Sequence, residues 1–214
     1  MLSEEALELI VQDRLAELEW VSGHGPDFAP GSGERDTWND IVLRGRLRNA
    51  VRNLNPGVPE EYLDQAIGEV ITPKSQSAIA ENRRIHQILV EGYRGIEYID
   101  HEGNAQNPTI YFLSSQPHKN DYLSLNQVTI ANLERERRFD VVCYVNGMPL
   151  AFIELKKTGA NTSVEGAHNQ LQTYVQEFGM AFRFANIVSP SDDLSAKYGT
   201  PFTPWNHFAP WNVD

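Results

Sequence analysis

The stretch that decides the fold runs from Phe139 to Lys157 and reads FDVVCYVNGMPLAFIELKK. Two apolar runs flank an Asn-Gly pair, which is the usual pattern of two strands joined by a tight hairpin turn. Charged residues nevertheless stand inside these runs, at Asp140, Glu154 and Lys156. Because buried strands rarely carry unpaired charge, these three positions need a chemical explanation.

Strand alternation brings the charged residues toward one point. Glu154 and Lys156 are two residues apart, so their side chains share one face of the strand. A strict two-residue loop would set Asp140 opposite Ile153, on the wrong face. A three-residue loop instead sets Asp140 opposite Phe152, diagonally next to Glu154. We therefore predict a three-residue loop with glycine in the left-handed conformation at its third position.

Two carboxylates on one face repel each other, and a divalent cation removes this conflict. Mg²⁺ suits such a site because it binds through one or two carboxylates and keeps several waters. Lys156 beside the metal could orient or deprotonate an attacking water, or stabilise charge developing on phosphorus. The pattern favours phosphodiester hydrolysis by Asp140, Glu154 and Lys156. The Glu-x-Lys spacing alone more often marks a solvated strand face with a weak ion pair.

Around the hairpin, the hydrophobic period changes from helical before residue 92 to alternating after it. The predicted helices are Ser3–Leu18, with its apolar residues on one face, Asn39–Leu54, Pro59–Val70 and Glu81–Glu91, with a loop at Gly23–Arg35. The predicted strands are Ile96–His101, Thr109–Ser114, Tyr122–Ile130, Phe139–Tyr144, Met148–Lys156 and Phe182–Val188. The last predicted helix starts from a capping box at Thr162 and Glu165 and closes at Gly179. The fold class is therefore α/β, with a central mixed sheet covered by helices.

Two polar residues of that last helix are expected near the charged hairpin. Gln170 and Tyr174 stand one helical turn apart on the face that packs against the sheet. Their polar ends should emerge close to Glu154 and Lys156, within reach of a DNA phosphate or of water bound to the metal. The alternative is a surface glutamine beside a tyrosine that packs only through its ring.

Composition limits the location and the partners. The chain has 214 residues, a net charge of −11 and a single cysteine, so it has no internal disulfide. It has no secretory signal and no apolar run of about 20 residues, and we expect a cytoplasmic protein without a membrane segment. Free-standing nucleic-acid binders usually carry a basic surface. If this chain acts on DNA, another part of its complex should hold the DNA, although Arg135–Arg138 is a candidate phosphate contact.

These residues resemble a known family. Asp140, followed by NGMPL at 146–150 and IELKK at 153–157, is similar to the nuclease motif of the restriction subunit (HsdR) of type I restriction-modification enzymes. That subunit belongs to the PD-(D/E)xK nuclease superfamily. The sequence QLQTY at 170–174 matches the Gln-x-x-x-Tyr motif that follows the nuclease lysine. Glu8 resembles an acidic residue that relatives bring near the metal, the alternative being a solvated glutamate on an amphipathic helix.

The resemblance implies a restriction-endonuclease-like core with an N-terminal helical region, spanning residues 1–214 as one nuclease domain of a longer subunit. The implied catalytic residues are Asp140, Glu154 and Lys156, with Glu8, Gln170 and Tyr174 in support. The implied metal ligands are Asp140, Glu154 and the Leu155 carbonyl, holding Mg²⁺ or Mn²⁺ in its place. ATP would act only through motor domains outside this chain. The implied partners are double-stranded DNA and the methylation and specificity subunits of a type I complex.

Two other functions are compatible with the sequence. In a non-catalytic docking module, the hairpin charges would form a buried ion-pair network that serves assembly. A stand-alone repair nuclease of the same superfamily would use the same residues, but the acidic net charge weighs against it. Binding of Mg²⁺ or Mn²⁺ separates the docking module from the nucleases.

Overall fold

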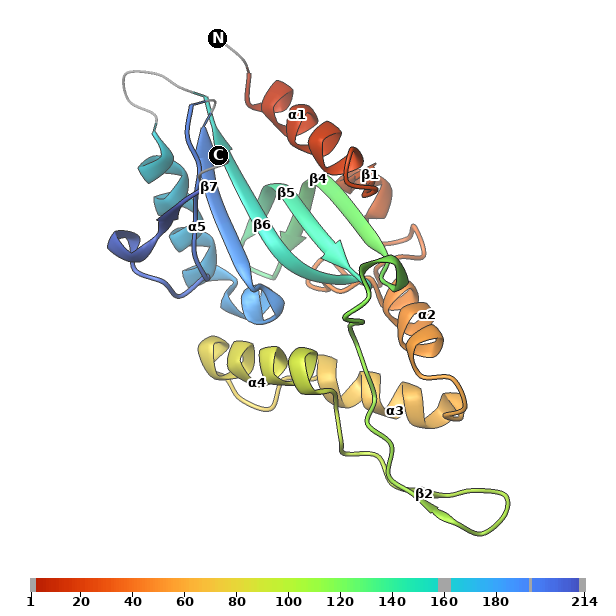
Figure 1. Ribbon diagram of the computed structural model, residues 1–214. Helices are drawn as coiled ribbons and strands as arrows, with labels where there is room; N and C mark the ends of the chain where they lie inside the picture. The colour runs from red at the N-terminus through yellow and green to blue at the C-terminus, as the bar shows by residue number, and fades with distance from the viewer. Residues whose placement is uncertain (1–2, 158–162, 193, 212–214) are drawn as a thin grey trace.

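The centre of the molecule is a five-stranded sheet of order β1-β4-β5-β6-β7 (Figure 1). The computed structural model describes residues 3–157, 163–192 and 194–211. Strands β4, β5 and β6 are antiparallel neighbours, whereas β1 pairs parallel with β4 and β7 pairs parallel with β6. The sheet is therefore mixed and flanked by helices, and the predicted fold class is confirmed.

The elements have the following bounds. The helices are α1 (Glu4–Ala16), α2 (Arg44–Leu54), α3 (Glu60–Ile71), α4 (Ala78–Glu91) and α5 (Val164–Glu177). The strands of the central sheet are β1 (Val21–His24), β4 (Tyr122–Ala131), β5 (Glu136–Val145), β6 (Met148–Lys156) and β7 (Ile187–Asp192). Two small sheets pair β2 (Tyr98–Ile99) with β3 (Ala105–Gln106) and β8 (Lys197–Tyr198) with β9 (Ala209–Pro210). The 3-10 helices are η1 (Gly25–Phe28), η2 (Pro117–Lys119), η3 (Gly179–Phe184) and η4 (Trp205–His207).

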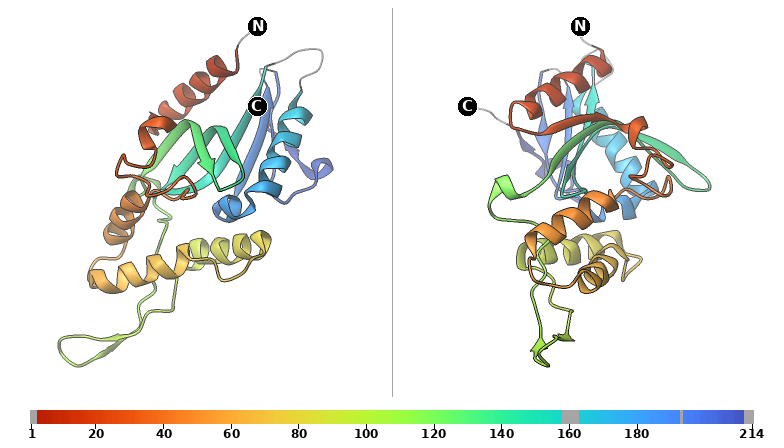
Figure 2. Two further views of the ribbon diagram at one scale, coloured as in Figure 1. Left: turned by 180° about the vertical axis from the view of Figure 1, so that it is seen from behind. Right: turned by 90° about the vertical axis from the view of Figure 1, so that its right-hand side faces the viewer.

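Helices cover both faces of the sheet (Figure 2). On one face, α1 packs through Leu7 against Val141 and Leu155. The other face meets α5, η3 and the group of α2, α3 and α4, and it contains the larger of the two hydrophobic clusters. Along the described ranges, none of the helices combines the length and the apolar character needed to cross a membrane.

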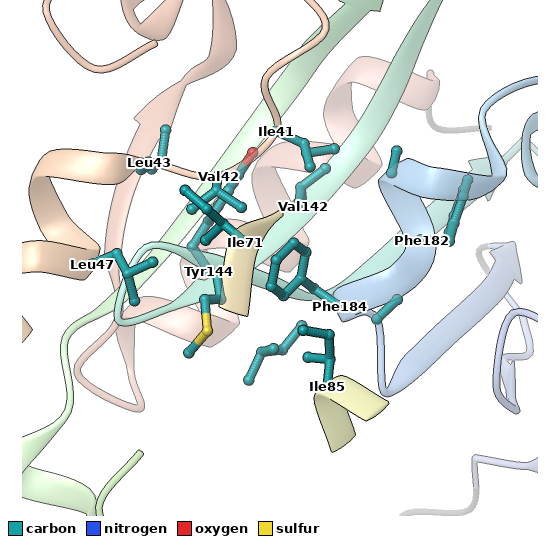
Figure 3. Close-up of a cluster of buried hydrophobic side chains, with 14 of the residues drawn as sticks. Ile41, Val42, Leu43, Leu47, Ile71, Ile85, Val142, Tyr144, Phe182 and Phe184 are labelled. Carbon is teal, nitrogen blue, oxygen red and sulfur yellow. The ribbon is translucent and has the colours of Figure 1, made fainter. Parts of the chain in front are cut away.

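Buried aromatic side chains hold the larger cluster together. Figure 3 shows Phe184 of η3 between Val142 and Tyr144 of β5 and Ile85 of α4. Phe182 of η3 packs against Phe152 of β6, with 4.7 Å between ring centroids. All of these side chains are fully buried. Burying a side chain of this size contributes about 1.5–3 kcal/mol, so this cluster fixes η3 and α4 against the hairpin strands.

Several predicted elements have different bounds in the structure. The predicted loop at Gly23–Arg35 begins inside strand β1, whose hydrogen bonds come from β4. The predicted helix at Asn39–Leu54 starts only at Arg44, because the residues before it are buried without being helical. The predicted strand at Phe182–Val188 begins in the 3-10 helix η3, which turns its phenylalanines at 182 and 184 into the core, and only Ile187 and Val188 belong to strand β7.

The segment between α4 and β4 also differs from the prediction. Ile96–His101 contains only the two-residue strand β2, and Thr109–Ser114 contains no strand beyond an isolated bridge from Ile110 to Tyr93. Strand β2 pairs with β3 in a narrow arm that projects from the body of the molecule (Figure 1). This arm does not join the central sheet. The alternation of apolar and polar residues in the arm therefore did not indicate a strand of that sheet.

Helix α5 is capped one residue later than predicted. The Ser163 hydroxyl accepts a hydrogen bond from Gly166 N at 3.3 Å and is the N-cap, whereas Thr162 lies outside the described residues. The helix ends at Glu177, and Gly179 opens η3 instead of closing α5. The helix itself is present where the sequence predicted one.

The hairpin turn is docked against the start of α2. Asn146 and Gly147 both have positive φ, 53° and 76°, as a two-residue type I′ turn requires. The Gly147 carbonyl accepts a hydrogen bond from Leu43 N at 2.9 Å. A Cβ added at Gly147 would press on the Leu43 carbonyl oxygen and lie 2.7 Å from Leu47 N. The turn therefore requires glycine at position 147 for its conformation and for its close approach to α2.

We expect Gly147→Ala to lower the free energy of unfolding by about 3 kcal/mol or more. The left-handed conformation accounts for about 1–2 kcal/mol, and displacement of the α2 backbone adds to it. Gly57→Ala is a matched control, because Gly57 has φ 90° and no atom within 4 Å of an added Cβ. Urea unfolding of both variants measures the difference. Equal losses in the two variants would show that the turn is not held against α2.

Candidate active site

A β-bulge in β6 sets the register of the candidate site. Next to the turn, Tyr144 pairs with Pro149, but one step further Cys143 pairs with Ala151. Leu150 is therefore an extra residue in β6. The predicted three-residue loop is wrong, because the turn has two residues and the extra residue lies inside the strand. The bulge shifts the rest of β6 by one position relative to β5.

This shift places the two acidic residues of the hairpin across from each other. The paired positions continue to Val141 and Ile153. One residue further along each strand stand Asp140 and Glu154. Without the bulge, Asp140 would face Ile153, as in the simple two-residue hairpin considered above. Asp140 and Glu154 share a face of the sheet, as expected from the sequence. The bulge in β6 brings this about, not the predicted three-residue loop.

Backbone pairing of β5 with β6 ends at this point. Beyond it, a side chain of β5 accepts the next hydrogen bond from the backbone of β6. The Asp140 carboxylate accepts a hydrogen bond from Leu155 N at 2.7 Å. Beyond it β6 continues to pair with β7, and β5 continues to pair with β4. Since Leu155 is buried, its N–H needs an acceptor, and Asp140 supplies it. The Asp140 carboxylate is thereby fixed between two separating strands.

Glu154 is fully buried, and its carboxylate is incompletely satisfied. Its Oε1 accepts a hydrogen bond from Lys156 Nζ at 3.2 Å, but Oε2 has no hydrogen-bond partner among the described residues. Burial, and then the charge of Asp140, raise the pKa of Glu154 well above its usual range. Burial also raises the pKa of Asp140, against the lowering effect of the Leu155 N–H. The positive charge near Asp140 and Glu154 therefore does not fully compensate their two carboxylates.

The Lys156 ammonium lies between two hydrogen-bond acceptors and one further carboxylate. It donates to Glu154 Oε1 at 3.2 Å and to the Leu155 carbonyl at 3.1 Å. It also lies 3.8 Å from Glu4 Oε1, in the first turn of α1. The sequence analysis missed Glu4. Its spacing of four residues from Glu8, on the same side of one helix, was the signal that could have found it.

Glu8 reaches the site from α1. Its side chain is almost completely buried and accepts hydrogen bonds from Asn126 Nδ2 at 3.2 Å and from Gln127 Nε2. Burial raises the pKa of Glu8, and the charge of Asp140 raises it further. The alternative interpretation of Glu8 as a solvated surface residue is wrong. Glu8 lies within electrostatic range of Asp140 and is held by two amides of β4.

Helix α5 brings Gln170 and Tyr174 together. Gln170 Nε2 donates a hydrogen bond to the Tyr174 hydroxyl, and the Tyr174 ring packs edge-on against Phe139 at 5.3 Å between centroids. Burial, followed by the charge of Glu154, raises the pKa of Tyr174 to about 12. The hydroxyl is therefore close enough to Glu154 to respond to its charge, and it stays protonated at neutral pH.

The basic cluster before Asp140 divides into two parts. Arg135 and Arg137 both bind Glu177 at the end of α5, the latter at 2.7 Å. Arg138 is exposed, and its charge lowers the pKa of both Asp140 and Glu8. Within the predicted phosphate contact at 135–138, Arg138 stands two residues before Asp140 and therefore shares its face of β5.

The donor set at this site suits a hard divalent cation. In the part of the chain that the structure describes, no group of three or more His, Cys, Asp or Glu is placed to hold a metal. The groups that could bind one here are the carboxylates of Asp140 and Glu154 and the Leu155 carbonyl. Such a set of oxygen atoms fits Mg²⁺, which completes its shell with water. The unpaired, buried Glu154 Oε2 is an acceptor that a cation would satisfy.

Comparisons with known proteins identify the family of the chain. Residues 1–207 match the family described as "Type I restriction enzyme R protein N terminus". The putative type I restriction enzyme MjaIXP endonuclease subunit of Methanocaldococcus jannaschii is 26% identical over 202 residues, which cover 92% of this chain and 19% of the relative. The type I restriction enzyme HindI endonuclease subunit of Haemophilus influenzae is 28% identical over 219 residues, covering 100% of this chain and 20% of the relative. The chain spans about one fifth of the length of these two curated relatives.

The raised pKa of Asp140 predicts that Asp140→Asn stabilises the metal-free chain at alkaline pH. A carboxyl group whose pKa is higher in the folded state contributes stability at low pH and loses it as the pH rises through that pKa. In EDTA at pH 8 we expect the variant to gain on the order of 1 kcal/mol, since the amide oxygen can still accept the Leu155 N–H bond. The gain should shrink as the pH falls toward 4.

Asp64→Asn is the control of opposite sign. Its hydrogen bonds from Arg48 lower the pKa of Asp64, so this variant should lose stability at pH 8 and lose less at low pH. Urea unfolding across pH 4–8 follows both variants. If Asp140→Asn destabilised the chain at pH 8 as Asp64→Asn does, the two carboxylates would not be in conflict.

Proposed function

This chain belongs to the family of type I restriction enzyme R protein N termini, and from that premise we propose that it is a metal-dependent endonuclease domain that cleaves DNA. The observation that carries the proposal is the buried pair of carboxylates, Asp140 and Glu154, beside the Lys156 ammonium. The two relatives named above are described as endonuclease subunits, which supports the same reaction. The substrate is the phosphodiester bond of double-stranded DNA.

In this proposal, Asp140, Glu154 and the Leu155 carbonyl hold Mg²⁺, for which Mn²⁺ can substitute. When bound, such an ion lowers the pKa of a coordinated water and polarises a phosphoryl oxygen. The Leu155 N–H keeps the Asp140 carboxylate in one orientation. Burial of Glu154 excludes water from its carboxylate and strengthens its electrostatic interactions. Asp140 and Glu154 would thus offer the cation a site that is already formed before the cation arrives.

The remaining residues act on the proton and the phosphate. Lys156 Nζ is a charged donor that can orient the attacking water or stabilise the negative charge that develops on phosphorus. The protonated Tyr174 hydroxyl, held by Gln170, can donate to a phosphate oxygen. Glu8, held by its two amide partners, maintains negative charge beside Asp140. In this proposal Lys156 is a catalytic residue, Glu8, Gln170 and Tyr174 are supporting groups, and none of the four binds the metal.

The domain would act as part of a multi-subunit complex. A chain of net charge −11 is poorly suited to holding DNA by itself. We therefore assign DNA recognition to methylation and specificity subunits, and ATP-driven translocation to motor domains that follow this nuclease domain in a longer subunit. The setting would be the cytoplasm.

A docking module explains the site less well. In a purely structural ion-pair network, each buried charged oxygen should have a partner. Glu154 Oε2 has none among the described residues, and the neighbouring Asp140 adds repulsion. A stand-alone repair nuclease would need a basic surface for its DNA, which the net charge of −11 does not favour.

We expect the chain to bind Mn²⁺ and Asp140→Ala to reduce that affinity at least about tenfold, because one of two anionic ligands is lost. Isothermal titration calorimetry measures the affinity. Asp13→Ala removes an exposed carboxylate from α1 and should leave the affinity unchanged. Equal Mn²⁺ affinity in the wild type and Asp140→Ala would remove Asp140 from the metal site.

Lys156→Ala should reduce DNA cleavage by the assembled restriction complex at least about 100-fold. Mn²⁺ binding and ATP-driven translocation should remain, because the lysine acts on the attacking water or the transition state. Cleavage of a circular DNA substrate and a translocation assay on the same preparation provide the two readouts. Lys119→Ala, an exposed residue of η2, is the matched control. Cleavage by Lys156→Ala at the normal rate would contradict the role of the lysine.

A further inference from the structure

The Lys156 ammonium contacts two of the three groups that the proposed function assigns to the metal. It donates to Glu154 Oε1 at 3.2 Å and to the Leu155 carbonyl at 3.1 Å. A divalent cation on those oxygens would repel an ammonium group at the same place. The lysine therefore has to give up these two contacts when the cation binds, while remaining close enough to act on the reaction.

In the described part of the chain, Glu4 supplies a third oxygen beside this ammonium, at ion-pair distance. Its Oε1 lies 3.8 Å from Lys156 Nζ, and its charge raises the pKa of both Asp140 and Glu154. The N-terminal end of α1 and the C-terminal end of β6 lie at the same end of the molecule (Figure 1). Glu4 is thus within range of the whole charged cluster, although it was not among the residues expected from the sequence.

The position of Glu4 is set by a helix that is firmly docked. The Ser3 hydroxyl caps α1 by accepting a hydrogen bond from Ala6 N at 3.1 Å. Gln12 Nε2 donates to the carbonyls of Gly23 at 2.8 Å and Ser124 at 3.2 Å, which ties α1 to β1 and β4. Because Leu7 and Gln12 attach α1 to the sheet, the first turn of α1, which carries Glu4, stays beside the end of β6.

We propose that Glu4 is a positioning residue for Lys156: it retains the ammonium when Asp140, Glu154 and the Leu155 carbonyl bind a divalent cation. This inference rests on the proposed function. Among the described residues, the oxygens beside the ammonium other than Glu4 are ones that the cation needs, so without Glu4 the ammonium competes with the cation for them. With Glu4, the ammonium stays beside the cation and keeps its charge available to the phosphate.

Two simpler roles for Glu4 give different results. An acidic residue in the first turn of a helix stabilises that helix through its dipole, which would affect folding but not metal affinity. A through-space attraction between Glu4 and the cation would raise metal affinity whether or not Lys156 is present. If Glu4 acts by retaining the lysine, its effect on metal affinity depends on the presence of Lys156. The two simpler roles predict no such dependence.

The test is a double-mutant cycle of Mn²⁺ affinity, measured by calorimetry on the wild-type chain, Glu4→Gln, Lys156→Met and the double variant. We expect Glu4→Gln to weaken Mn²⁺ binding about tenfold in the wild-type background and less than about threefold in the Lys156→Met background. Lys156→Met alone should bind Mn²⁺ at least as tightly as the wild type. Glu5→Gln removes an exposed charge from the same helical turn and should change nothing.

An equal loss of affinity from Glu4→Gln in both backgrounds would overturn the inference, as would no loss in the wild-type background. Either result leaves the proposed function intact provided that the wild-type chain binds Mn²⁺. A wild-type chain without Mn²⁺ affinity would overturn the proposed function together with this inference. Urea unfolding verifies that each variant is folded, and Lys156→Gln replaces Lys156→Met if the latter is not.

Discussion

The site depends on the point at which β5 and β6 stop pairing. Up to Val141 and Ile153 the two strands exchange backbone hydrogen bonds, and beyond that position the Asp140 carboxylate accepts the bond from Leu155 N. This exchange satisfies a buried N–H and at the same time fixes a carboxylate beside Glu154. The bulge at Leu150 and the turn docked on α2 matter because together they determine which residues stand at the point of separation.

The same arrangement is costly for the metal-free fold. Two carboxylates with raised pKa values lie side by side, and one oxygen of Glu154 has no partner among the described residues. The single ammonium of Lys156 offsets part of this repulsion. The aromatic cluster on the α5 side and the docking of α1 on the other face keep the strands in place despite it. Functional sites commonly hold such locally unfavourable groups, which the surrounding packing stabilises.

The sequence predicted the convergence of Asp140, Glu154 and Lys156, because strand alternation constrains it directly. It did not predict where the hairpin holds its extra residue. The predicted loop places the extra residue at Val145, on the β5 side, and would pair Asp140 with Phe152, whereas the bulge places it at Leu150 in β6 and brings Asp140 opposite Glu154. The contact of Gly147 with Leu43, which are about 100 residues apart in the chain, favours the second. Similarly, strand β1 pairs with β4, about 100 residues further along the chain, so its own residues carry little strand pattern. The apolar pattern of α1 also misled: Glu8 and Gln12 are buried, whereas Ile10 and Leu18 are exposed, because β1 and β4 supply hydrogen-bond partners that no local pattern reveals.

The most direct measurement of the central claim is anomalous diffraction from crystals of the chain soaked in Mn²⁺. We expect one strong manganese peak within about 2.0–2.4 Å of carboxylate oxygens of Asp140 and Glu154 and of the Leu155 carbonyl oxygen. We also expect the Lys156 ammonium to have moved off the last two groups. A soaked crystal with no peak there, or with manganese bound only elsewhere, would contradict a metal centre at the point where the two strands separate.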